Sequence, residues 1–160
     1  MPAARRDAVL LDTNMLLLLG IGLLNPDDVS RYKRTNQYER SDYERLRTLM
    51  APFRRTITTP HILAELSNLA IDVGTGKPSR HVKTLVDLIR QTWEVSVAKD
   101  AYVDHPAFIR LGVTDAAILT LAVQDRRPVI TDDFLLYSYL LRAKATVAKL
   151  SHGRGKEWGL

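Results

Sequence analysis

The chain has 160 residues, of which 46% are hydrophobic and 26% are charged, and its formal net charge is +5. These values are ordinary for one globular domain and carry no signature of intrinsic disorder. The chain contains no cysteine, which excludes disulfides, thiolate metal sites and cysteine catalysis. A bound metal would therefore need oxygen or imidazole ligands.

The apolar runs near the N-terminus are short. Ala8–Leu11 ends at Asp12, and Met15–Leu19 is too short for a typical signal-peptide core. No run reaches the roughly 18 apolar residues that a membrane helix needs. We therefore predict a cytoplasmic protein without a membrane partner, built as a single domain over residues 1–150 with a basic tail at 151–160.

Hydrophobic periodicity and capping signals predict the elements of the first half of the chain. Ser41 and Glu44 have the spacing of a capping box, in which each side chain bonds to the backbone of the other residue at a helix start. In chain order we predict a buried strand at Ala8–Leu11, a helix over Met15–Leu24 that Gly20 and Gly22 weaken near its end, a loop or lid at Asn25–Arg40, a helix from Ser41 to about Phe53, and a strand at Thr56–Thr59.

The second half continues the alternation of helices and strands. Thr59 followed by Pro60 is typical of a helix start, because the threonine can cap the helix and proline fits its first turn. After that helix we predict a glycine-rich break at Asp72–Pro78, a helix capped by Ser79 over Arg80–Thr92, a strand at Trp93–Val97, a partly helical stretch at Ala101–Leu111, a left-handed stop at Gly112, a helix over Asp115–Gln124 capped by Thr114, a strand at Pro128–Thr131, a helix over Phe134–Lys144 and a strand at Thr146–Leu150.

Strands that alternate with helices favour a parallel sheet covered by helices on both faces. The strands are short and apolar, as expected for a sheet that is buried on both sides. We therefore predict an α/β fold with three layers, α/β/α, and a central, mostly parallel sheet of short strands. In such folds ligands bind beyond the carboxyl ends of the strands, which is where functional residues are expected.

Acidic residues stand at that predicted edge. Asp12 follows the first strand, Asp132 and Asp133 follow the Pro128–Thr131 strand, and Asp115 and Glu65 lie on helices. Taken singly, each has an ordinary structural explanation as a turn residue, a cap or a solvated helix residue. Glu65 fits that explanation least, because apolar neighbours place it at or beside a buried stripe and no lysine or arginine is near in sequence.

Several carboxylates that converge in one place repel one another, and their pKa values must rise unless a cation compensates them. Mg²⁺ and Mn²⁺ prefer oxygen ligands, and they can activate a water molecule and stabilise charge on a phosphoryl group. The acidic residues therefore favour a Mg²⁺ or Mn²⁺ cofactor and phosphodiester chemistry, which needs neither thiol nor histidine.

Four motifs carry a family resemblance: Leu11-Asp-Thr-Asn14, His61-Ile-Leu-Ala-Glu-Leu66, Leu111-Gly-Val-Thr-Asp-Ala-Ala-Ile118 and Val129-Ile-Thr-Asp-Asp-Phe134. Any one of them is weak evidence, but the Gly-x-Thr-Asp-Ala-Ala-Ile and Thr-x-Asp pieces are fairly specific together. In these motifs, their order and their spacing, the chain resembles the PIN-domain ribonucleases, which include the VapC-type toxins of toxin–antitoxin pairs. The resemblance covers roughly residues 8–150.

The resemblance implies a PIN-like fold and a nuclease that hydrolyses single-stranded RNA with metal-activated water, leaving a 5′-phosphate and a 3′-hydroxyl. It implies catalytic and metal-binding roles for Asp12, Glu65, Asp115 and Asp133, and supporting roles for Asn14, Thr131 and Asp132. Asp133 matches the last position of Thr-x-Asp, whereas Asp132 occupies the free position, and the choice between them stays open. An antitoxin partner and a homodimer are also implied by the resemblance.

A basic segment predicts contact with RNA, either single-stranded or structured. Between Arg31 and Arg55 there are eight basic and three acidic residues, so this stretch accounts for the net charge of the chain. We expect phosphate contacts and base stacking from a set in which cations and tyrosines are interleaved: Arg31, Tyr32, Lys33, Arg34, Tyr38, Arg40 and Tyr43. The alternative is a solvated loop whose tyrosines pack locally.

The polar segment Leu24–Tyr43 is long for the stretch that follows the first motif of the family. It could dock an antitoxin, clamp RNA, or mark a PIN branch that has no antitoxin. Two other functions are weighed against the nuclease. A phosphoacceptor receiver domain needs paired acids at the first strand end, where this chain has one, and a lysine for which Lys149 is a loose candidate. A non-catalytic PIN scaffold that binds RNA or protein is disfavoured, because all four ligand positions are acidic.

Overall fold

The computed structural model describes residues 7–70 and 80–151. Its elements in chain order are β1 (Ala8–Leu11), α1 (Thr13–Leu24), the 3-10 helix η1 (Pro26–Asp28), α2 (Arg40–Met50), β2 (Arg55–Thr58), α3 (Pro60–Ala70), α4 (Arg80–Gln91), β3 (Trp93–Glu94), the 3-10 helix η2 (Lys99–Ala101), α5 (Phe108–Gln124), β4 (Val129–Thr131), α6 (Phe134–Arg142) and β5 (Val147–Lys149). The predicted break at 72–78, the cap at Ser79 and the tail beyond Ser151 lie outside the described residues.

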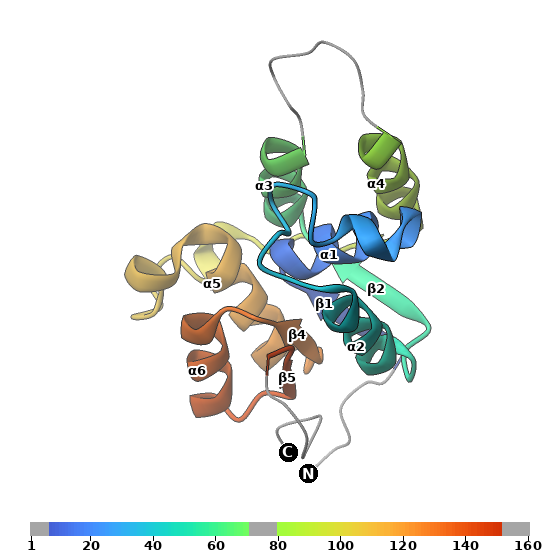
Figure 1. Ribbon diagram of the computed structural model, residues 1–160. Helices are drawn as coiled ribbons and strands as arrows, with labels where there is room; N and C mark the ends of the chain where they lie inside the picture. The colour runs from blue at the N-terminus through green and yellow to red at the C-terminus, as the bar shows by residue number, and fades with distance from the viewer. Residues whose placement is uncertain (1–6, 71–79, 152–160) are drawn as a thin grey trace.

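The described strands form one five-stranded sheet in the order β3-β2-β1-β4-β5, and every neighbouring pair is parallel. Helices α2, α3 and α4 pack against α1, whereas α5 packs against α6 on the other side of the sheet (Figure 1). The predicted three-layer α/β/α fold with a central parallel sheet of short strands is thus confirmed. The chain first builds outward from β1 to β3, then crosses back to β4 and β5, so the direction of winding reverses between β1 and β4.

The core is centred on β1 and α1. All four residues of β1 are buried, as expected for the middle strand of a sheet that is covered on both faces. Helix α1 is also buried along most of its length, which explains why it is apolar on nearly every side. Within the two described ranges, none of the helices has the length and the apolar character that a membrane crossing requires.

Helix α1 ends at Leu24, as predicted, and runs without a break through Gly20 and Gly22. A Cβ atom at Gly22 would overlap the ring of Tyr43 on α2, and a Cβ atom at Gly20 would meet the end of the Leu85 side chain on α4. The two glycines therefore let neighbouring helices approach the α1 backbone closely.

We expect Gly22→Ala to destabilise the fold by up to about 2 kcal/mol. Alanine gains roughly 1 kcal/mol in helix propensity, but overpacking against a buried ring typically costs about 1–3 kcal/mol. Urea denaturation monitored by circular dichroism measures the change. Gly20→Ala is the matched control and should cost less, because the Leu85 side chain that it meets can change rotamer. A Gly22→Ala protein that is more stable than the wild type would contradict this packing argument.

Of two helix starts predicted from capping signals, that of α2 is wrong and that of α3 is confirmed. Helix α2 begins at Arg40 rather than after Ser41, and the carboxylate of Asp42 accepts a hydrogen bond from the backbone N–H of Glu39 at 2.8 Å. The same three-residue spacing fits both pairs, so the sequence pattern alone was ambiguous by two residues. The start of α3 is as predicted, since the hydroxyl of Thr59 accepts from the backbone N–H of Ile62 at 3.2 Å.

The predicted stop at Gly112 is a kink inside α5. Gly112 has φ 77° and ψ −179°, a conformation that L-residues rarely adopt, and α5 resumes directly after it. The kink lies three residues before Asp115 and therefore sets the direction in which the second part of α5 leaves that point. Strand β3 is shorter than predicted and ends at Glu94.

Candidate active site

The reversal of winding between β1 and β4 places two acidic segments side by side. Strands β1 and β4 pair in parallel with Leu11 opposite Ile130, and the backbone N–H of Asp12 donates to the carbonyl oxygen of Ile130 at 3.3 Å. Asp12 and Asp133 thus leave the carboxyl ends of adjacent strands. In doubly wound α/β sheets this crevice is where ligands bind.

Asp12 is buried and serves as the N-cap of α1. One carboxylate oxygen accepts from the backbone N–H of Met15 at 2.8 Å, and the other accepts a short hydrogen bond from the hydroxyl of Thr131. Burial raises the pKa of Asp12 to about 6, although these hydrogen bonds oppose the rise. An aspartate that only capped a helix would not need to lie buried beside a second acidic segment.

Thr131 links the two strand ends. Its hydroxyl donates to Asp12 and accepts from the backbone N–H of Asp133 at 3.0 Å. One fully buried hydroxyl therefore sets the position of a carboxylate after β1 and of the backbone after β4.

Glu65 on α3 is held differently from what its apolar neighbours predicted. Its side chain is exposed, so the prediction of a buried charge beside the apolar stripe is wrong. One carboxylate oxygen accepts from the hydroxyl of Thr13 at 2.8 Å, and the other accepts from the hydroxyl of Thr114 at 2.6 Å. Both threonines are buried, so two fixed hydroxyls on α1 and α5 orient an otherwise exposed side chain. Thr114 was predicted as a helix cap and instead makes this contact.

Asp115 shows that the acidic side chains share one environment. Its pKa is raised to about 7, mainly by burial and in addition by the charges of Asp12, Asp133 and Glu65. The described residues bring together, from α1, α3, α5 and α6, the four acids that the motifs singled out. We call these four residues the carboxylate cluster.

The contacts of Asp132 and Asp133, the two acids after β4, indicate which of them belongs with the carboxylate cluster. Asp133 adds to the rise in the pKa of both Asp12 and Asp115, and its carboxylate caps α6 by accepting from the N–H of Leu136 at 2.7 Å. Asp132 instead accepts from the N–H of Ser151 at 3.0 Å, and the ammonium of Lys149 lies 3.8 Å from the same oxygen. The geometry therefore groups Asp133 with the carboxylate cluster and ties Asp132 to the end of β5.

The carboxylate oxygens of the cluster are ligands of the type that a hard divalent cation prefers. Within residues 7–70 and 80–151, no lysine, arginine or histidine forms an ion pair with any member of the carboxylate cluster. Each carboxylate has about four lone-pair sites, so the hydrogen bonds described above leave acceptor capacity free. In the same part of the chain, however, no three acidic or histidine side chains are arranged to hold a metal ion as they stand. Binding would require the side chains to draw closer around the ion, which would offset their mutual repulsion.

Asn14 does not support the cluster in the way that the resemblance implies. Its side chain is exposed on the first turn of α1 and makes no hydrogen bond in the part of the chain that the structure describes. Thr13, the residue before it, is the one that reaches an acid. The prediction for Asn14 was one position away from the side chain that makes the contact.

The three tyrosines for which base stacking was predicted pack locally to different degrees. Tyr38 and Tyr43 belong to the buried core, and Tyr32 packs against the ring of His81 with 5.1 Å between the ring centres. The segment between η1 and α2 is likewise no free lid, because Val29 and Thr35 are fully buried and the hydroxyl of Thr35 donates to the carbonyl of Val29 at 2.7 Å.

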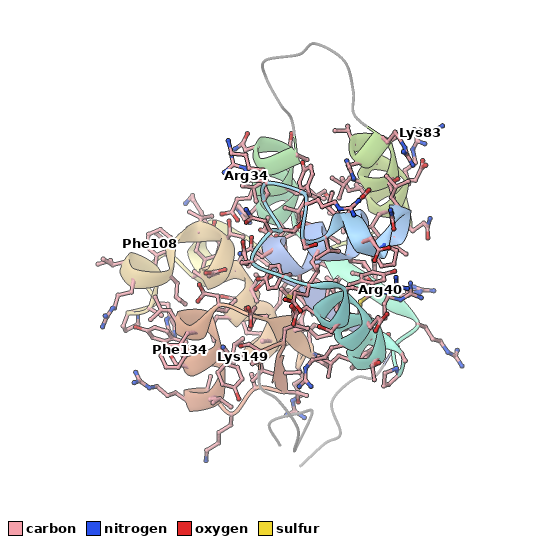
Figure 2. The ribbon with its side chains drawn as sticks, viewed as in Figure 1. Arg34, Arg40, Lys83, Phe108, Phe134 and Lys149 are labelled. Atoms are coloured by element: carbon pink, nitrogen blue, oxygen red, sulfur yellow. The ribbon has the colours of Figure 1, made fainter. Side chains whose placement is uncertain are left out.

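The predicted RNA-binding cations separate into two groups. Arg31, Lys33 and Arg34 are exposed and form no ion pair with another described residue. Arg40, far from Arg34 in Figure 2, bonds to Asp27 at 3.0 Å and to Glu44 at 2.9 Å. Arg40 is therefore engaged at the start of α2, whereas the other three are available to an anionic partner.

Three residues at the site were not singled out for a role there: Thr13, Thr114 and Tyr38. The two threonines adjoin acids in the motifs, at Asp12-Thr13 and Thr114-Asp115, and this adjacency was the signal that could have found them. Tyr38 had no such signal. Burial and the neighbouring carboxylate of Asp132 raise the pKa of its phenol well above the usual range, which places it beside the end of β4.

No protein-family model matches this chain, and no curated protein sequence matches it either.

Proposed function

We propose that this chain is a cytoplasmic, Mg²⁺- or Mn²⁺-dependent endoribonuclease that hydrolyses single-stranded RNA. The observation that carries the proposal is the electrostatic environment of Asp115, whose pKa is raised by burial and by Asp12, Asp133 and Glu65 together. Four acids from four segments lie near enough to the switch point of the parallel sheet for the charges of three to act on Asp115, and no basic side chain of the described residues forms an ion pair with them. Uncompensated carboxylates at such a point are suited to a divalent cation.

In this proposal Asp12, Glu65, Asp115 and Asp133 are the ligands. A divalent ion bound by them supplies an activated water molecule and stabilises charge on the phosphoryl oxygens. Thr131 holds the carboxylate of Asp12 towards the crevice, and its hydrogen bond to the backbone of Asp133 keeps the two strand ends in register. Half-buried Asp115 experiences the charges of the other three carboxylates, and a divalent ion held there would lower the pKa that burial and those charges raise.

The exposed cations Arg31, Lys33 and Arg34 support an RNA substrate, since they offer charge to the phosphate backbone without a competing partner among the described residues. A toxin role, an antitoxin partner and a homodimer are proposed on the resemblance to VapC-type toxins alone. The presence of a small gene directly upstream would be the simplest test of the toxin role.

The test of the proposed function is cleavage of end-labelled single-stranded RNA by the purified protein. We expect endonucleolytic products with 5′-phosphate ends in Mn²⁺ or Mg²⁺, and no products when EDTA is in excess. Asp125→Asn serves as a control for loss of one negative charge, because Asp125 is exposed at the end of α5 and its side chain has no bonding partner among the described residues. That variant should cleave as fast as the wild type.

Cleavage that continues in EDTA would refute a metal-dependent mechanism. Binding of RNA without cleavage under any divalent ion would instead support the alternative of a non-catalytic scaffold. The two results are separated by measuring binding and product formation in the same samples.

A further inference from the structure

We propose that Phe134, at the start of α6, is a stacking platform for an unpaired base of the RNA next to the cleaved phosphate. This inference rests on the proposed function, because it assigns a substrate contact beside the carboxylate cluster. Phe134 is 72% exposed, the largest exposed fraction of any aromatic side chain in the described residues. A phenylalanine that stays in water forgoes free energy of burial, which a bound partner could recover.

Phe134 cannot turn into the core, because the backbone around it is fixed. Asp133 caps α6 through Leu136, and its own N–H donates to Thr131. Two residues along a helix correspond to a rotation of about 200°, so Phe134 and the fully buried Leu136 face opposite sides of α6. The exposure of the ring therefore follows from the same hydrogen bonds that place the carboxylate of Asp133.

Other large apolar side chains on α5 and α6 are exposed as well, and we call the set Ile109, Val113, Phe134 and Leu135 the α5/α6 patch. Helices α5 and α6 pack together, and Figure 2 shows the starts of both helices, marked by Phe108 and Phe134, on the same side of the molecule. Large apolar side chains that stay exposed on neighbouring helices are candidates for an interaction site.

The α5/α6 patch is continuous along the chain with the carboxylate cluster. Phe134 follows Asp133 directly, and Val113 precedes Thr114 and Asp115. Neighbouring Cα atoms are about 3.8 Å apart, so a group that rests on Phe134 lies within a short reach of Asp133. A base that stacks on Phe134 would therefore belong to the part of the RNA nearest to the carboxylate cluster.

An unpaired base is the occupant that this position favours. Single-stranded nucleic acid is held by aromatic rings on which bases stack and by nearby cations that contact phosphates. Tyr38 and Tyr43 of the basic segment are buried and Tyr32 is half-buried against His81, whereas the ring of Trp93 on the edge strand β3 has two guanidinium groups at 5.4 Å, those of Arg55 and Arg127. Phe134 lacks such a cover, and exposed Arg110 lies next to Ile109 in the patch.

The experiment measures binding of a fluorescein-labelled single-stranded RNA in EDTA, so that no cleavage occurs. We expect Phe134→Ala to weaken affinity about 5- to 100-fold, as for loss of one stacked base, and Phe134→Trp to retain it.

A series of RNAs that each carry one abasic position locates the stacked base. The loss of affinity caused by Phe134→Ala should vanish when the abasic position occupies the stacking site. The added tryptophan of Phe134→Trp should also be quenched by the normal RNA. Leu141→Ala, an exposed apolar residue farther along α6, is the control and should bind as the wild type does.

Wild-type affinity in Phe134→Ala, or no measurable binding by the wild type in EDTA, would overturn the proposal. A second copy of the chain is the other possible occupant, and sedimentation velocity tests it. If Phe134→Ala dissociates a dimer and leaves RNA affinity unchanged, the patch is a contact between two copies of the chain. The outcomes are distinct from those of the proposed function. A wild type that binds RNA through Phe134 but never cleaves it refutes the nuclease and keeps the platform, and the reverse result keeps only the nuclease.

Discussion

Asp12→Asn is expected to reduce RNA cleavage on the order of 10³-fold while making the metal-free protein more stable. The loss of activity follows because a ligand of the proposed ion becomes a neutral amide, and metal stabilisation of the transition state amounts to several kcal/mol. The gain in stability follows because Asp12 is buried and its pKa is raised to about 6 from 3.8. A group that is costly for folding and essential for activity is typical of a functional site.

The pH dependence of this stability gain has a definite sign. Folding the metal-free protein with Asp12 ionised is unfavourable, because the raised pKa means that the folded state binds the proton more tightly than the unfolded state does. Well below pH 3.8 both states are protonated and Asp12 costs nothing. As the pH rises from there through about 6, stability is lost progressively, and above that value the full cost of about 1–3 kcal/mol applies. Asp12→Asn removes this cost.

Thermal unfolding in EDTA at several pH values measures the effect. The melting temperature of Asp12→Asn should exceed that of the wild type at pH 7 by about 2–4 °C for each kcal/mol. The two should converge as the pH falls well below 3.8. Added Mn²⁺ should raise the melting temperature of the wild type but hardly that of the variant, because only a bound ligand shifts the unfolding equilibrium. Cleavage at the wild-type rate by Asp12→Asn, or equal melting temperatures across this pH range, would contradict the assignment of Asp12 as a buried metal ligand.

The sequence predicts the order of strands and helices and the layers of the fold, because these depend on local signals. The apolar run of β1, the helical period of α3 and the Thr59–Pro60 start are each visible within a few residues. The position of acids directly after β1 and β4 also follows from the sequence, since parallel strands end at one edge of the sheet. These local signals were enough to predict both the layers and the edge at which the acids lie.

The segment between α1 and α2 shows where such signals fail. Its composition is polar, which predicts a loop or lid, but a few of its residues are buried against the rest of the chain, among them Val29, Thr35 and Tyr38. Whether a tyrosine in a polar stretch points inward depends on the shape of the surface below it, which no local pattern encodes. Because Tyr38 is buried, it cannot stack on a base, and we propose exposed Phe134 for that role instead. From the sequence alone, Phe134 was not considered for it.

The contacts of Glu65 are a second example. Its partners Thr13 and Thr114 are 52 and 49 residues away in sequence, and both hydroxyls reach it only after α1, α3 and α5 have packed. Apolar neighbours suggested a buried carboxylate, but a helix face that is half covered can leave one side chain exposed at its border. The sequence placed Glu65 near the core correctly and misjudged what surrounds its charge.

Removing these two hydroxyls is the second change for which we expect a large effect. Thr13→Val and Thr114→Val keep the shape of each side chain and delete one donor, so one carboxylate oxygen of Glu65 loses its fixed partner. Because Glu65 is exposed, water can replace the lost bond, and stability should change by only about 1 kcal/mol. Its orientation, however, is no longer fixed. Loss of a residue that orients a metal ligand typically weakens metal affinity or activity about 10- to 100-fold, and we expect the double variant to lie at the upper end.

Mn²⁺ affinity, followed by the paramagnetic resonance of the free ion, tests this expectation independently of cleavage. Thr114→Ser supplies the sharpest comparison, because serine restores the hydroxyl and should return affinity to within about threefold of the wild type, as expected when the charge-assisted hydrogen bond is regained. Thr120→Val is a matched control on the same helix, where the lost hydroxyl bonds only to the carbonyl of Ala116 at 2.8 Å. The contrary outcome is that Thr114→Val and Thr114→Ser bind Mn²⁺ equally weakly, or that Thr120→Val binds it as weakly as either. In both cases the loss of affinity would reflect packing of α5, and the hydroxyls would have no part in orienting Glu65.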